Sequence, residues 1–175
     1  MGLVNKMKKH IPNIITTIRL IAAGIFPIAF VYDLGIATII FIVASLSDGI
    51  DGFLARKWDV VSEYGKRIDP IADKLLVGGA LLLATIYIDI YLVIPLVLEI
   101  IIAVLNVLLY KKSNLFNVTK WGKVKAIFLY PMIAIGLLTH IYSNLETPFY
   151  ILLVITAILQ LITSISYIRQ YYKSK

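Results

Sequence analysis

Four aspartates stand in two closely spaced pairs. Asp48 and Asp51 are three residues apart, and Asp69 and Asp73 are four residues apart. Either spacing places both carboxylates of a pair on one face of an α-helix. Carboxylates that are brought together repel one another and lose hydration, which is unfavourable unless cations compensate. Because hard divalent ions prefer oxygen ligands, the two pairs predict a site for Mg²⁺ or Mn²⁺.

The residues around the first pair suit a ligand that contains phosphate. Gly52 follows Asp48 by one helical turn and, with the small Ala55, leaves room for a bulky group against the helix backbone. Arg56 carries a planar set of donors that matches phosphate. Two metal ions close together are a common arrangement for displacement at phosphorus. We therefore expect a site with two ions.

The elements that must position these residues are long apolar stretches. Hydrophobic residues make up 60% of the 175-residue chain and charged residues 15%, whereas soluble domains are usually near half apolar and a quarter charged. Each stretch is about 20 residues long, which is enough for a helix to cross about 30 Å of hydrocarbon. The six stretches are 12–32, 36–56, 68–88, 91–110, 122–142 and 147–168. They predict an all-α, polytopic membrane protein with six transmembrane helices in a single domain, 1–175.

Residues 3–10, which precede the first stretch, mix apolar side chains with lysines and predict a short amphipathic segment on the membrane surface. Prolines then mark the starts of three helices, namely Pro12, Pro70 and Pro148. The connection between the second and third stretches is short, so we expect these helices to be antiparallel neighbours. Their two aspartate pairs would then face each other at one end of the helices.

The distribution of charge predicts the orientation in the membrane. With six spans, both termini and the loops near 57–67 and 111–121 lie on one side, and all 17 Lys and Arg residues fall on that side or at the helix ends facing it. Basic loops stay in the cytoplasm, so the chain is predicted to be a multi-pass cell-membrane protein with its active site and both termini facing the cytoplasm. A net charge of +7 favours anionic membrane lipids. Basic residues scattered over loops between spans do not indicate a nucleic-acid partner.

The aspartate-rich segment resembles the signature of the CDP-alcohol phosphatidyltransferases without a departure. The signature fixes eight positions over 26 residues, which read Asp48-x2-Asp51-Gly52-x2-Ala55-Arg56-x8-Gly65-x3-Asp69-x3-Asp73. The resemblance implies an enzyme that displaces CMP from a CDP-linked lipid, usually CDP-diacylglycerol, with an alcohol acceptor. It also suggests a homodimer, for which Gly78 and Gly79 are candidate contact points, although they could equally pack within one subunit.

The resemblance also implies a role for each motif residue. Asp48, Asp51 and Asp69 would bind metal, and Asp73 would be both a metal ligand and the base that activates the acceptor hydroxyl. The nucleotide and pyrophosphate site would be lined by Gly52, Ala55, Arg56, Ser62 and Gly65. Asn13 and Thr16 could reach the nucleotide, or they could be ordinary helix caps.

The flanking sequence is most similar to bacterial phosphatidylglycerophosphate synthases, which implies glycerol 3-phosphate as the acceptor. Their fourth helix carries an Arg-Glu pair and a later Arg, where this chain has Leu98, Glu99 and Asn106. Positive charge for an acceptor phosphate could come instead from Lys123, Lys125 or Arg19, although lysines at a helix end also mark topology. Glu99 could pair with a lysine or bind a non-phosphorylated or cationic acceptor. Phosphatidylglycerol, which would give cardiolipin, and other alcohols therefore stay open as acceptors.

A transporter coupled to divalent cations or protons is the alternative from another class. Such a protein is expected to place carboxylates near mid-bilayer on broken helices, often within inverted repeats. Here the aspartates gather toward one face and no repeat is visible. The pattern favours the enzyme.

Overall fold

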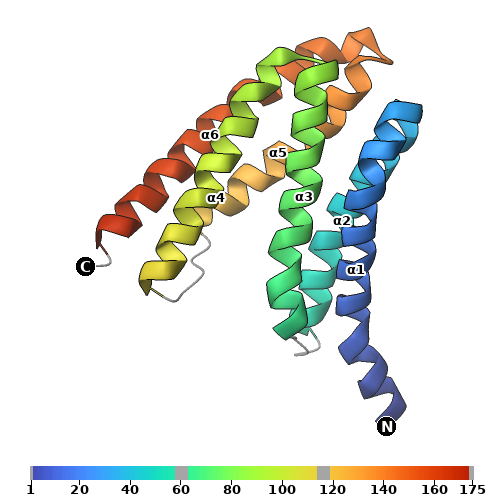
Figure 1. The fold of residues 1–175 in the computed structure, drawn as a ribbon, viewed down its shortest axis with the longest axis vertical. Coiled ribbons are helices and arrows are strands. Elements are labelled where there is room, and N and C mark those ends of the chain that lie inside the picture. The colour runs from blue at the N-terminus through green and yellow to red at the C-terminus, as the bar shows by residue number, and fades with distance from the viewer. Residues whose placement is uncertain (1, 58–62, 114–118, 174–175) are drawn as a thin grey trace. The chain divides into compact units, whose positions relative to one another are not determined.

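The computed structural model describes the backbone of residues 2–57, 63–113 and 119–173 and the side chains of residues 13–47, 68–112 and 119–172. All secondary structure in these ranges is helical (Figure 1), which confirms the all-α prediction. The α-helices are α1 (Gly2–Tyr32), α2 (Leu34–Lys57), α3 (Glu63–Tyr87), α4 (Val93–Ser113), α5 (Lys120–Thr139) and α6 (Glu146–Lys173). Two short 3-10 helices, η1 (Ile90–Leu92) and η2 (Ser143–Leu145), precede α4 and α6.

Among the described residues, five helical segments are long and apolar enough to cross a membrane. They are Asn13–Tyr32, Ile68–Tyr87, Ile90–Lys112, Lys120–Thr139 and Ser143–Tyr172. The apolar part of α2 whose side chains are described, Leu34–Ser47, is shorter. The polytopic membrane fold is therefore confirmed, with each helix lying where the sequence places an apolar stretch.

Two helix starts were predicted wrongly because proline was taken to mark them. α1 begins at Gly2 and runs without a break through the segment expected to be a separate amphipathic piece. α3 begins at Glu63, so Pro70 lies inside the helix. Proline removes one backbone hydrogen bond, but membrane helices tolerate this where neighbouring groups satisfy the freed carbonyl. Pro148, by contrast, does lie in the first turn of α6.

The chain divides within α3 into two units, residues 1–80 and 81–175. In the first unit, α1 and α2 are joined only by Asp33, which accepts a hydrogen bond from the Ile36 amide at 2.9 Å and so caps α2. The two helices pack through small and aromatic side chains, and the rings of Phe26 and Phe41 lie 6.1 Å apart. This packing holds α1 and α2 side by side, and the N-terminal turns of α1 extend beyond α2 (Figure 1).

In the second unit, α6 packs against both α4 and α5. At one end, Asp89 accepts hydrogen bonds from the Tyr91 amide at 2.8 Å and from the Tyr150 hydroxyl at 2.6 Å, which ties η1 to α6. On α5, a Cβ at Gly136 would lie 2.8 Å from a ring carbon of Phe149. The absence of a side chain at Gly136 therefore allows α5 to approach α6 closely.

Candidate active site

Both predicted aspartate pairs lie in helices. Asp48 and Asp51 fall near the end of α2, and Asp69 and Asp73 fall in the first half of α3. The helical backbone thus provides the three- and four-residue spacings that put each pair on one face. Side chains that lie outside the described residues are those of Asp48, Asp51, Ala55 and Arg56, and Ser62 lies outside them altogether. Gly52 and Gly65 are helical.

Asp69 is held from α1. The Thr16 hydroxyl donates to Asp69 Oδ1 at 2.5 Å, and Thr16 is 1% exposed while Asp69 is half-buried. Hydroxyl-to-carboxylate bonds of this kind are short and strong because the acceptor is charged. The bond orients the Asp69 carboxylate through an uncharged donor. Thr16 is therefore placed at a predicted metal ligand.

Arg19 lies one turn after Thr16 and reaches α2. It is 1% exposed, and its Nε donates to Ser47 Oγ at 3.4 Å. The Ser47 hydroxyl itself donates to the Ala44 carbonyl at 2.7 Å, so its oxygen is positioned as an acceptor toward α1. Ser47 directly precedes Asp48 in the chain. Arg19 thus contacts the residue next to the first predicted metal ligand.

Asn13 and Thr16 are not helix caps. Because α1 begins at Gly2, both lie well inside the helix, and the capping interpretation is wrong. Asn13 is half-buried, and its carbonyl accepts from the Thr17 hydroxyl at 2.8 Å. Asn13 also lines an open hollow of about 330 Å³ on α1 with Ile14, Thr17 and Ile18. Contact of Asn13 with a nucleotide stays a prediction.

The described carboxylates fit a hard divalent ion. Asp69 and Asp73 are both half-buried, four residues apart on α3, and offer only oxygen donors. The side chains that the structure describes contain no group of three or more potential metal ligands. The other half of the predicted set, Asp48 and Asp51, lies outside those side chains. The observed pair, with Asp69 already oriented by Thr16, suits Mg²⁺ or Mn²⁺ better than a softer metal.

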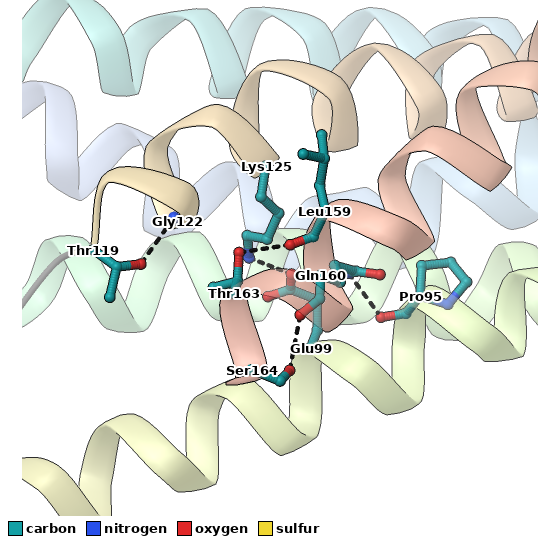
Figure 2. A network of polar contacts seen from close by, with 9 residues as sticks. All are labelled: Pro95, Glu99, Thr119, Gly122, Lys125, Leu159, Gln160, Thr163 and Ser164. Carbon is teal, nitrogen blue, oxygen red and sulfur yellow. Dashed lines mark hydrogen bonds and ion pairs between the residues drawn. The ribbon is translucent and has the colours of Figure 1, made fainter. Parts of the chain in front are cut away.

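A second buried polar cluster joins α4, α5 and α6 (Figure 2). Lys125 forms an ion pair with Glu99, and the two side chains are only 11% and 12% exposed. Gln160 donates from its amide nitrogen to Glu99 Oε1 at 3.0 Å and to the Pro95 carbonyl at 3.1 Å. The ion pair is one of the two roles suggested for Glu99. Gln160 was missed, although a glutamine within an apolar span is itself a signal of an interhelical contact.

The two lysines proposed for the acceptor differ in their surroundings. Lys125 is buried and paired with Glu99, whereas Lys123 is exposed on the same helix. The first turn of α5 is fixed by Thr119, whose hydroxyl accepts from the Gly122 amide at 3.0 Å. Of the two lysines, only Lys123 has an exposed side chain that could bind a ligand.

Comparison with known sequences agrees with the motif. The sequence model of the family described as CDP-alcohol phosphatidyltransferase matches residues 9–165. A protein of Haemophilus influenzae named CDP-diacylglycerol–glycerol-3-phosphate 3-phosphatidyltransferase is 37% identical, over 93% of this chain and 94% of its own. Proteins of the same name from Yersinia enterocolitica and Yersinia pestis are 31% and 34% identical, over 95% and 87% of this chain and 97% and 90% of their own.

Proposed function

This chain belongs to the CDP-alcohol phosphatidyltransferase family, and from that premise we propose that it transfers a phosphatidyl group from CDP-diacylglycerol to glycerol 3-phosphate with release of CMP. The observation that carries the proposal is similarity along nearly the whole chain to enzymes named for that reaction. The complete aspartate motif supports the transfer chemistry independently. The chain is thus a membrane enzyme, and the acceptor is the proposed part.

We assign the chemistry to the four aspartates. Asp48, Asp51 and Asp69 would hold two Mg²⁺ or Mn²⁺ ions together with Asp73, and bound ions would neutralise charge on the pyrophosphate. Asp73 would accept the proton of the acceptor hydroxyl as its oxygen attacks the β-phosphorus. The bond between that phosphorus and the CMP oxygen breaks, and CMP leaves. Thr16 supports this assignment, because it orients Asp69 one turn before Asp73.

The donor nucleotide and its pyrophosphate would contact residues around the aspartates, from α1 to the start of α3. Arg56 supplies a planar fork of donors for phosphate, and the small residues allow the ligand to approach the helix backbone. The proposed contacts are Asn13, Thr16, Gly52, Ala55, Arg56, Ser62 and Gly65. Thr16 already donates its proton to Asp69, so it could only accept from a nucleotide.

For the acceptor phosphate we favour Lys123 over the other two candidates. Lys125 is neutralised by Glu99, and Arg19 is 1% exposed in the interior of the α1–α2 pair. Lys123 is exposed and is not part of the described ion pair. Neither Leu98 nor Asn106 offers the positive charge that arginines would supply at those positions. A single lysine cation would then hold the phosphate of glycerol 3-phosphate.

We further propose a cytoplasmic active site and a homodimer. The basic residues support the orientation, since α4 ends on Lys111 and Lys112 and basic helix ends face the cytoplasm. A Cβ at Gly78 or Gly79 would meet no atom within 4 Å in the described part of the chain. Because glycine allows membrane helices to approach closely, we keep Gly78 and Gly79 as candidate contact points of the dimer.

The test is an acceptor screen with the purified, detergent-solubilised enzyme. CDP-diacylglycerol and Mg²⁺ or Mn²⁺ are combined with glycerol 3-phosphate, phosphatidylglycerol, glycerol or inositol, and CMP release and the lipid product are measured. We expect product only with glycerol 3-phosphate, and a strongly reduced rate of product formation from Asp73→Asn. Product with phosphatidylglycerol or an uncharged alcohol, but none with glycerol 3-phosphate, would overturn the acceptor assignment and leave the transferase intact.

A further inference from the structure

α1 presents two buried polar side chains toward the two helices that carry the aspartates. Thr16 and Arg19 are three residues apart, so they lie on one face of α1, and each is 1% exposed. Thr16 bonds to Asp69 on α3, and Arg19 bonds to Ser47 on α2. One helix face therefore contacts Asp69 of one aspartate pair and Ser47, the residue that directly precedes the other pair.

The burial of Arg19 needs an explanation that packing alone does not provide. A guanidinium removed from water is very unfavourable unless it is paired and hydrogen-bonded. The Ser47 hydroxyl satisfies one of its five N–H donors but carries no charge. Asp33, at the far end of α1, is 14 residues away, or about 20 Å along the helix. Asp69 and Asp73 are the other carboxylates of this unit whose side chains are described, so we take the negative charge that balances Arg19 to come from the aspartate end of the unit.

We propose that Arg19 is a positioning residue for the metal site: it holds the aspartate-bearing end of α2 against α1 through Ser47, as Thr16 holds Asp69. The inference rests on the proposed function, because it takes the aspartates as metal ligands. It differs from the role suggested by the sequence, in which Arg19 would contact the acceptor. It also differs from a purely structural tie, in which Arg19 would stabilise the α1–α2 pair without any effect on metal affinity.

Direct binding of Mn²⁺ separates these roles. Free Mn²⁺ is measured by electron paramagnetic resonance with the full-length protein in detergent and without lipid substrate, and folding is followed by circular dichroism. Arg19→Gln is expected to weaken Mn²⁺ binding about 10- to 100-fold, the range typical for groups that orient metal ligands. Arg19→Lys keeps the charge but loses the planar fork, so we expect an intermediate loss. Arg169→Gln removes an exposed arginine of α6 and should leave the affinity unchanged.

Ser47→Ala provides the second variant, because it removes the contact while both α1 and α2 keep their apolar packing. We expect its Mn²⁺ affinity to fall a few-fold. If Arg19→Gln does not fold, Mn²⁺ binding by Ser47→Ala still tests the proposal. Unchanged or tighter Mn²⁺ binding in folded Arg19→Gln, or in Ser47→Ala when Arg19→Gln does not fold, would overturn the proposal. If the unaltered protein binds no Mn²⁺ yet releases CMP, the aspartates are not the metal site and the inference fails with them. Failure of the acceptor screen alone would leave it standing.

Discussion

Buried polar side chains have different roles in the two units of the chain. In the first unit, Thr16 and Arg19 on α1 each contact a segment that carries aspartates, and the described partner of the Asp69 carboxylate is the uncharged hydroxyl of Thr16. In the second unit, the Glu99 carboxylate is neutralised by the Lys125 cation, and the same oxygen, Oε1, also accepts from the Gln160 amide. A carboxylate within an apolar helix is therefore not in itself a sign of catalysis. What matters is whether a cation within the protein already neutralises the carboxylate.

Removal of divalent metal is the strongest test of this difference. If the first unit holds aspartates for metal, excess EDTA should abolish CMP release, and Mg²⁺ or Mn²⁺ should restore it. The second unit contains a neutralised pair and should show no response, so the thermal stability of the α4–α6 bundle should not depend on metal. Full activity in excess EDTA would contradict the proposal that the first unit's aspartates bind metal while Glu99 in the second unit does not.

The next largest effect is expected at the proposed base. Asp73→Asn keeps the shape and part of the ligand capacity but cannot accept a proton, so kcat should fall about 10²- to 10⁴-fold. Mn²⁺ binding should fall much less. Asp48→Asn is the matched comparison, since loss of a pure ligand should weaken Mn²⁺ and CDP-diacylglycerol binding together. Near-normal turnover by Asp73→Asn would place the base elsewhere.

In the second unit, removal of one partner of the ion pair should act on stability. Lys125→Met leaves the Glu99 carboxylate buried without its cation, which typically costs about 3–5 kcal/mol. The double variant Lys125→Met/Glu99→Leu should recover most of that loss, because apolar replacement of a buried pair is often neutral. Unfolding of the unaltered protein, both single variants and the double variant in mild detergent measures the coupling. A stable double variant with poor use of glycerol 3-phosphate would instead assign Lys125 to the acceptor site.

Much of this architecture could be predicted from the sequence, because long apolar stretches and aspartate spacing are local properties. The six helices and the helical setting of both aspartate pairs follow directly from them. The predicted starts of α1 and α3 were wrong because proline can lie inside a helix when the loss of one backbone hydrogen bond is tolerated. The partners of Thr16, Arg19 and Gln160 could not be predicted, since they depend on how each helix is rotated against its neighbours.

The smallest expected effect concerns Lys123, which differs from Lys125 on the same helix. Lys123 is exposed and Lys125 is paired, although only one residue separates them on α5. If Lys123 holds the acceptor phosphate, Lys123→Ala removes a charge-assisted contact worth about 1.5–3 kcal/mol, or roughly ten- to a hundredfold in kcat/KM for glycerol 3-phosphate. The KM for CDP-diacylglycerol and the unfolding temperature should stay near those of the unaltered protein, unlike in Lys125→Met. Lys120→Ala, at the exposed start of the same helix, controls for loss of a basic residue at this membrane face. An equal loss in both alanine variants would indicate general attraction of the anionic acceptor to a basic surface rather than a specific contact.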